Sequence, residues 1–208
     1  KEASRDALNA KNLIAYSIAE IALAYAELRS NLVCESYSHM SGCMRRLVIA
    51  GVMPRDYPAN FLLEMLLAFH QQGFNPLPFF DLSGEISRLS AGPNVHLKGV
   101  ALRLSAVQGR KDAARSMRDL IESENCLKRS GDRVELAKTH AEMARLALQA
   151  GDQAKARELA LAAWDGLSGL NLFPDDLSSL LEATVLENDS FTDRAGQLFE
   201  MIEQILTN

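Results

Sequence analysis

Apolar residues recur at three- and four-residue spacing along almost the whole chain. Such spacing places apolar side chains on one face of an α-helix, whereas a half-buried β-strand needs strict alternation, which this sequence lacks. Ala, Leu, Glu and Arg, which favour helices, are abundant, and the 208 residues include only 6 prolines and 12 glycines. The sequence therefore predicts an all-α protein.

Breaks in this pattern divide the chain into about ten predicted helices. They span residues 4–29, 32–50, 59–72, 82–89, 95–108, 112–128, 134–149, 153–167, 176–186 and 191–206. On the first of them, the spacing predicts a buried face made of Leu13, Ile14, Ile18, Ile21 and Tyr25. The clearest interruption is Ala91-Gly92-Pro93-Asn94, so we expect degenerate helical hairpins over 1–92, two long repeats over 93–172 and capping or connector helices over 173–208.

The predicted turns carry residues suited to ending one helix and starting the next. Gly109 and Gly151 follow helical segments, and glycine adopts the left-handed conformation that ends a helix at little cost. Asp112 and Asp152 come shortly afterwards, where their carboxylates can cap the next helix. The two glycines are 42 residues apart, which exceeds the roughly 34 residues of a standard tetratricopeptide repeat.

Small residues at helical spacing indicate a repeat within this region. They are clearest in the segment from His140 to Ala163, which carries Met143, Ala144 and Ala147 before the turn and Ala156, Ala160 and Ala163 after it. A similar layout places Ala101 and Leu102 before Gly109, and Ala114 and Ile121 after it. Small residues let antiparallel helices approach closely, and a further helix then covers the pair. The alternative is a generic helical bundle.

The run from Gly131-Asp132 through Gly151-Asp152 to Gly166 resembles the long-repeat tetratricopeptide (TPR) arrays of large bacterial regulators. The resemblance implies a right-handed α-α superhelix of antiparallel hairpins, a TPR-like solenoid. It also implies an interaction and signalling role within an enhancer-binding, alternative-sigma-factor-dependent type of transcription regulator. Catalysis and DNA binding would then belong to other domains of the same protein.

Charge and composition limit the kinds of partner and the cellular location that we expect for this chain. The net charge is −5, and the segment from Asp165 to the end holds nine acidic residues and one basic residue. This distribution is unlike a nucleic-acid footprint. We expect no membrane span, because no long apolar run occurs, and a cytoplasmic location, because the three cysteines form no dense framework. The chain begins with Lys1 already in helical pattern, so we interpret it as a piece of a longer protein.

Repeat geometry predicts one partner-binding surface. In TPR arrays the first helix of each pair lines the concave face, which here places His96, Arg103, Lys138 and Arg145 on that face. The basic members would suit an acidic peptide, an acidic partner protein or the acidic tail of this chain. The alternative is an ordinary solvated polar face.

The last predicted helix carries an apolar seam with heptad-like spacing, formed by Phe191, Ala195, Leu198, Ile202 and Ile205. One interpretation is a connector helix that pairs with a second copy to give a homodimer. The other is a capping helix that covers the end of the solenoid, since Phe199 and Leu206 widen the apolar stripe.

No constellation in the sequence predicts catalysis, a cofactor or a metal. Cys34, His39 and Cys43 are the nearest approach to a ligand cluster, but three ligands at these positions of one helix cannot converge on a tetrahedral ion. We expect the cysteines to be buried core thiols, and Trp164 and the methionines Met40, Met44, Met65, Met117 and Met143 to be core residues. Two functions remain open, a non-catalytic interaction and signal-relay module or a ligand- or peptide-sensing helical domain that gates a neighbouring effector domain.

Overall fold

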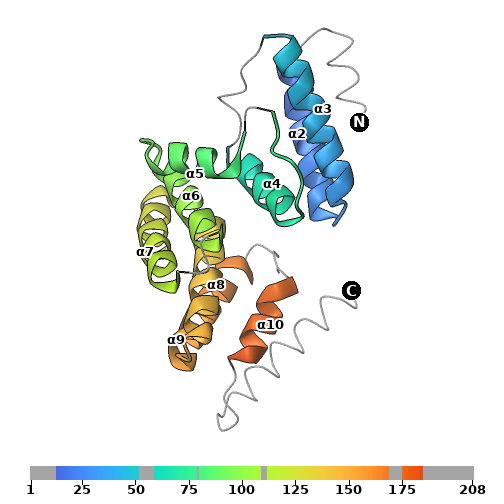
Figure 1. Cartoon of the computed structure of the whole chain (residues 1–208). Coiled ribbons are helices and arrows are strands. Elements are labelled where there is room, and N and C mark those ends of the chain that lie inside the picture. The colour runs from blue at the N-terminus through green and yellow to red at the C-terminus, as the bar shows by residue number, and fades with distance from the viewer. Residues whose placement is uncertain (1–12, 52–58, 79, 109–111, 169–174, 185–208) are drawn as a thin grey trace. The chain divides into compact units, whose positions relative to one another are not determined.

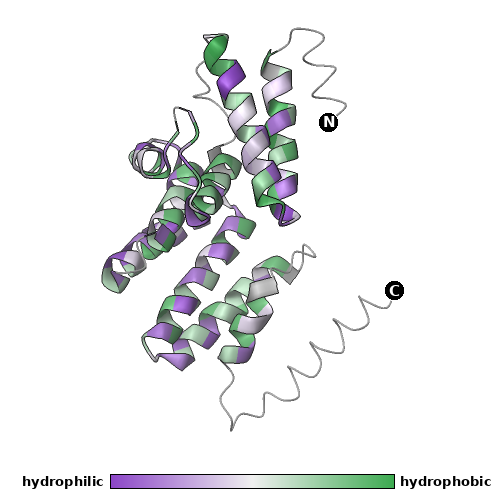
Figure 2. Ribbon diagram, turned by 45° about the vertical axis from the view of Figure 1, so that its right-hand side comes forward, coloured by the Kyte–Doolittle hydropathy of each residue, from purple (hydrophilic) through white to green (hydrophobic). Residues whose placement is uncertain are grey.

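The computed structural model of the chain describes residues 13–51, 59–78, 80–108, 112–168 and 175–184 (Figure 1). These residues are mainly helical, and the described part contains no strand beyond an isolated bridge between Leu77 and Phe80. Hydrophobic and hydrophilic residues are interleaved along the helices (Figure 2), as one-sided packing requires. The predicted all-α class is confirmed.

The chain divides into two compact units, Lys1–Gly131 and Asp132–Asn208. The boundary lies inside the segment 93–172, which the sequence analysis assigns to a single pair of repeats. The units are described separately below, and the superhelical arrangement of hairpins stays a prediction.

The first unit contains six of the described helices. They are α2 (Leu13–Arg29), α3 (Val33–Ile49), α4 (Ala59–Gln71), α5 (Leu82–Ser90), α6 (Val95–Gln108) and α7 (Ala113–Ser130). Two extensive helix pairs, α2 with α3 and α6 with α7, lie on either side of α4 in the order of the chain. Helix α4 packs against α2, α3, α5 and α6, so it links the two pairs.

The second unit contains α8 (Arg133–Gln149), α9 (Gln153–Ser168) and α10 (Asp175–Ala183). Helices α8 and α9 form a close pair, and α10 contacts both of them. The residues that predicted this pair are mostly buried, with Ala144, Ala156, Ala160 and Ala163 fully inaccessible and Trp164 5% exposed. A third helix therefore covers a hairpin built on small residues.

The turn residues adopt the conformations that the sequence predicts. Asp112 Oδ1 accepts a hydrogen bond from the backbone N–H of Arg115, and Asp152 Oδ1 accepts one from that of Lys155, both at 3.0 Å. Gly151 has a φ of 79° directly after α8. The other predicted turn glycine, Gly109, lies outside the described residues.

Close helix contact in the α6–α7 pair occurs at Gly99. A Cβ atom added there would lie 2.7 Å from Leu127 Cγ and 3.2 Å from Cys126 Cβ. The carbonyl oxygen of Gly99 also accepts a hydrogen bond of 2.7 Å from the buried hydroxyl of Ser123. The missing side chain thus allows α6 and α7 to approach and to be joined by a buried hydrogen bond.

Two expected packing faces were wrong in part, although Ile21 of the face predicted on α2 is buried as expected. On α7, Ala114 and Ile121 are exposed, and the buried residues are Ser116, Leu120, Ser123, Cys126 and Leu127. On α2, Ile18 is 52% exposed, whereas Tyr16, Ser17, Glu20, Ile21 and Ala24 are buried. On α7 the buried hydroxyls of Ser116 and Ser123 donate to backbone carbonyls of α6, whereas on α2 the hydroxyl of Ser17 donates to the carbonyl of Leu13 in its own helix.

None of the helices in the described ranges combines the length and the apolar character needed to cross a membrane. The predicted seam over 191–205 lies outside the described residues, so it stays a prediction.

Candidate functional site

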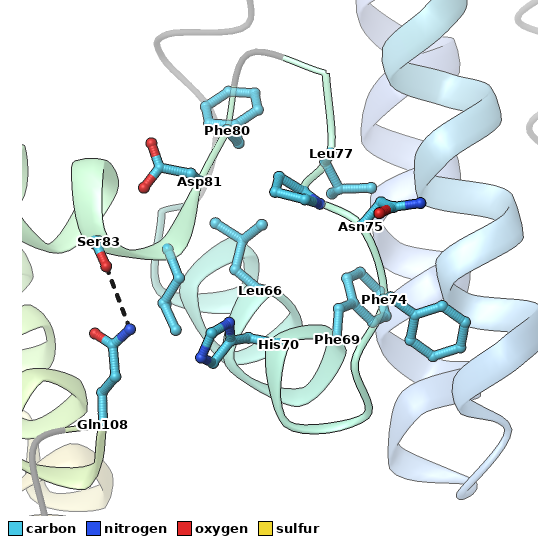
Figure 3. Close-up of a pocket in the computed structure, with 12 residues that line it drawn as sticks. Leu66, Phe69, His70, Phe74, Asn75, Leu77, Phe80, Asp81, Ser83 and Gln108 are labelled. Carbon is cyan, nitrogen blue, oxygen red and sulfur yellow. Dashed lines mark hydrogen bonds between the residues drawn. The ribbon is translucent and has the colours of Figure 1, made fainter.

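A pocket of about 250 Å³ opens in the first unit beside α4, the segment that follows it, and the start of α5 (Figure 3). Seven apolar side chains and five polar ones line it. They are Leu66, Phe69, Phe74, Pro76, Leu77, Phe80 and Leu82, with His70, Asn75, Asp81, Ser83 and Gln108. Such a combination of an apolar wall with a few polar groups is typical of sites for small ligands.

The local sequence explains why the chain turns here. Gly73, with a φ of 75°, follows the end of α4, and the N–H of Phe74 bonds back to the carbonyl of Phe69 at 3.0 Å. Pro76 and Pro78 have no N–H to continue a helix. Asp81 then caps α5 by accepting a 2.7 Å hydrogen bond from the N–H of Gly84. The pocket wall is therefore an extended segment between two well-ended helices.

Three aromatic rings hold this segment against α3 and α4. Tyr37 stacks on Phe74 with ring centroids 4.4 Å apart, and it meets Phe69 edge-on at 5.3 Å. Phe69 and Phe74 are themselves 6.2 Å apart. Ring pairs at these separations add stabilisation beyond the area that they bury. The wall of the pocket is thus anchored from behind.

The five polar side chains are exposed at the pocket mouth. On one side, Gln108 Nε2 donates to Ser83 Oγ at 3.3 Å, and Asn75 and Leu77 lie on the other side (Figure 3). Asp81 brings a carboxylate to the lining, and Asn75, Ser83 and Gln108 bring neutral oxygen acceptors. The pocket could not be predicted from the sequence, because its lining comes from four separate segments.

The predicted basic surface is distributed over both units. His96 and Arg103 lie on α6, whereas Lys138 and Arg145 lie on α8. Lys138 Nζ is 2.8 Å from Glu135 Oε1, and Arg145 Nη1 is 2.5 Å from Glu142 Oε1. Lys138, Arg145 and His96 are partly exposed, so these three remain candidates for partner contact.

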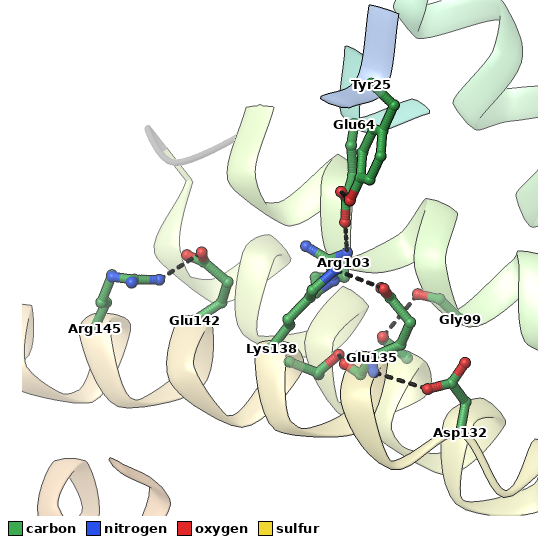
Figure 4. A network of polar contacts seen from close by, with 11 residues as sticks. Tyr25, Glu64, Gly99, Arg103, Asp132, Glu135, Lys138, Glu142 and Arg145 are labelled. Atoms are coloured by element: carbon green, nitrogen blue, oxygen red, sulfur yellow. Dashed lines mark hydrogen bonds and ion pairs between the residues drawn. The ribbon is translucent and has the colours of Figure 1, made fainter. Parts of the chain in front are cut away.

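Arg103 differs from the other three because it is buried, with 6% of its surface exposed. Its Nη2 is 3.4 Å from Glu64 Oε1 on α4, and Glu64 Oε2 accepts a 2.7 Å hydrogen bond from the Tyr25 hydroxyl on α2 (Figure 4). The prediction that Arg103 lines an open face is therefore corrected, since the side chain ties α6 to α4. A lone glutamate inside the apolar run 61–69 was the signal that could have indicated this network.

The first helix pair contains a second buried polar cluster. Burial, followed by the nearby Glu20 carboxylate, raises the pKa of the Cys43 thiol to about 12. The same two causes raise the pKa of Tyr16 to about 12. The Arg46 guanidinium opposes both shifts, and it also donates to the Tyr16 hydroxyl. Both groups are protonated at neutral pH, so Cys43 is a structural thiol.

Cys34 and His39 do not share that environment. Cys34 is exposed, which corrects the expectation that it is a core thiol. His39 Nδ1 pairs with Glu27 across the α2–α3 hairpin. Within the described ranges, no group of three or more His, Cys, Asp or Glu side chains gathers in a way that could hold a metal ion.

No protein-family model, curated protein or solved structure matches this chain at a significant level. The pocket and the exposed side chains of α8 are therefore the features from which a function can be argued.

Proposed function

We propose that this chain is a non-catalytic protein–protein interaction and signal-relay module of a bacterial regulatory protein. The observation that carries the proposal is the second unit, in which α10 covers a hairpin of α8 and α9 built on buried alanines. Natural repeat proteins stack helical hairpins of this kind into long surfaces that bind other proteins. The TPR-like residues between His140 and Ala163 support the same proposal.

The proposed partner is an acidic protein or peptide, or an adjacent acidic domain of the same protein. Lys138 and Arg145 are separated by two helical turns on α8, so their side chains lie on the same side of the helix. Each already has a glutamate neighbour on α8, and a partner carboxylate would compete with it. Binding should therefore be moderate in affinity and weakened by salt.

A peptide-library selection against the chain tests this proposal. Enriched peptides should be rich in Asp and Glu, and calorimetry should show that K138Q/R145Q weakens their binding. The matched control is K155Q/R157Q on α9, which removes the same number of charges and should leave binding nearly unchanged. If no enriched peptide binds better than its version with Asp and Glu replaced by Asn and Gln, the interaction proposal is wrong.

The cellular location of the module and the type of protein that contains it are proposed from the resemblance to TPR arrays and from the composition. It would be cytoplasmic, would make no direct contact with nucleic acid, and would form part of an enhancer-binding, alternative-sigma-factor-dependent type of regulator. The seam from Phe191 to Ile205 would join two copies. Light scattering would test this last point, because I202D should then convert a dimer to a monomer.

The second candidate function is a ligand-sensing helical domain that gates a neighbouring effector domain. The pocket beside α4 favours it, because the pocket joins an apolar wall to several polar side chains. Its wall contacts α3 through Tyr37 and continues into α5 through the Asp81 cap. A bound ligand would thus contact α4, the start of α5 and the end of α6, and the wall that it contacts packs against α3.

A further inference from the structure

We infer that the pocket beside α4 binds a small uncharged aromatic ring that carries an N–H or O–H donor, such as indole. The inference rests on the second candidate function, ligand sensing, and names the class of ligand. Three properties of the pocket lead to it: its volume, the character of its mouth and the anchoring of its wall.

The volume sets the size of the ring. A cavity of about 150 Å³ lined by aliphatic and aromatic side chains accommodates benzene, which has six non-hydrogen atoms. In proportion, a nine-atom bicyclic ring needs about 225 Å³, and this pocket measures about 250 Å³. Larger drug-sized molecules need roughly 300 Å³ or more. The enclosed space therefore matches a ligand group of one or two fused rings.

The walls set the polarity of the ring. Leu66, Leu77, Phe80 and Leu82 are each less than 7% exposed, so they offer a preformed apolar surface. An aromatic or aliphatic group would replace poorly bound water against these side chains. A strongly polar ligand would lose its hydration there without gaining partners.

The mouth sets the preference for a donor. Asp81 has two carboxylate oxygens, of which Oδ1 caps α5. The Nε2 of Gln108 donates a hydrogen bond to Ser83 Oγ, and the amide oxygen of Gln108 can accept one from a ligand. Asn75 adds another amide oxygen to the lining. A ring N–H or O–H could donate to one of these acceptors, whereas a ligand carboxylate would be repelled by Asp81.

The anchored wall makes binding possible for a small ligand. Tyr37 stacks on Phe74, and the backbone of Phe80 donates to the carbonyl of Leu77 at 3.0 Å. A site that is already ordered loses little conformational entropy on binding, so more of the limited interaction energy of a nine-atom ligand remains as affinity. The expected dissociation constant is on the order of a millimolar.

The experiment uses the full chain and three related probes: indole, 1-methylindole and indole-3-carboxylate. Ligand-observed NMR should detect indole most strongly, with 1-methylindole weaker by about tenfold because it lacks the donor. Indole-3-carboxylate should bind least. Equal binding of all three probes would overturn the inference, as would no binding of indole.

Two variants test the location. S83F places a ring at the pocket mouth and should reduce indole binding at least about tenfold. S87F, one turn further along α5 and also exposed, adds the same ring away from the pocket and should leave binding unchanged. Indole binding that survives S83F would overturn the inference. In the unmodified chain, indole should also shift the side-chain amide signals of Asn75 and Gln108, and unshifted signals would contradict the site.

N-acetyl-tryptophanamide distinguishes the source of the ring. Competition between it and indole would show that the pocket accepts the ring as part of a peptide, and exclusion of the amide with retention of indole would show that the ligand is a free small molecule. The peptide selection on α8 is measured separately. Failure of indole binding would therefore remove the pocket inference and leave the interaction proposal standing.

Discussion

Glu64 is a single carboxylate within the apolar run of α4, and its side chain contacts two other helices. Its two oxygens serve Arg103 and Tyr25, which belong to α6 and α2. Three helices thus meet at one side chain. A buried guanidinium needs a negative neighbour, because its desolvation is otherwise uncompensated.

We predict that E64Q lowers the free energy of unfolding by about 1–3 kcal/mol, because it removes the negative charge beside the buried Arg103 while keeping the shape of the side chain. Urea denaturation followed by circular dichroism measures this change. E158Q is the matched control, since Glu158 pairs with Lys155 on the surface and its side chain is 67% exposed. That variant should change stability by less than about 0.5 kcal/mol, and equal effects would contradict the role of Glu64.

The three cysteines should differ in reactivity because their surroundings differ. Cys34 is exposed, whereas Cys43 is fully buried and Cys126 is 6% exposed. The raised pKa of Cys43 also keeps its thiol protonated, and the thiolate is the reactive form. We predict one fast thiol per folded chain in a chromogenic thiol assay, and all three in denaturant. C34S should abolish the fast phase, and a fast phase that remains would show that a buried thiol is accessible.

At the level of helices, close packing in the α6–α7 pair depends on the missing side chain of Gly99. We predict that G99A lowers the free energy of unfolding by about 1–2 kcal/mol, because overpacking against Leu127 exceeds the gain of about 1 kcal/mol in helix propensity. The matched control is G42A on α3, where an added Cβ has no neighbour within 4 Å. That variant should raise the midpoint of thermal unfolding. A stabilising G99A would show that the two helices separate easily.

Helix bounds could be predicted from the sequence to within a few residues where local chemistry sets them. Asp152 and Gly151 fix one turn through a cap and a left-handed backbone, and neither depends on distant residues. The buried face of α2 could not be predicted, because Glu20 is hidden and Ile18 is exposed against the usual preference. That reversal depends on Cys43 and Arg46 of α3, which periodicity within one helix does not reveal.

At the level of the whole molecule, the tertiary fold creates a pocket that the sequence does not indicate. The pocket brings Leu66, Leu77 and Leu82, from the stretch that spans α4 to α5, together with Gln108 at the end of α6, and none of these residues indicates a site by itself. The resemblance to TPR arrays concerns α8 and α9, whereas the pocket lies in the first unit, where the repeat pattern is weakest. The two proposed functions, interaction and ligand sensing, therefore rest on features of different units of the chain.

The stability of the whole chain should fall at alkaline pH. A raised folded-state pKa of about 12 for Cys43, compared with an ordinary value of 9.0, means that the unfolded chain loses this proton first. The contribution is therefore intact below about pH 9 and is lost progressively as the pH rises toward 12. Tyr16 acts in the same direction, from 10.0 to about 12.

Urea unfolding between pH 7 and pH 11 measures this dependence. General charge repulsion also rises with pH, but it affects every variant of the chain alike. C43S removes the buried titrating group, so its stability should decline less steeply than that of the unmodified chain above pH 9. C34S removes an exposed thiol and should follow the unmodified chain. If C43S and C34S decline equally, the environment of Cys43 does not favour the protonated thiol, and the buried cluster between α2 and α3 must be arranged differently.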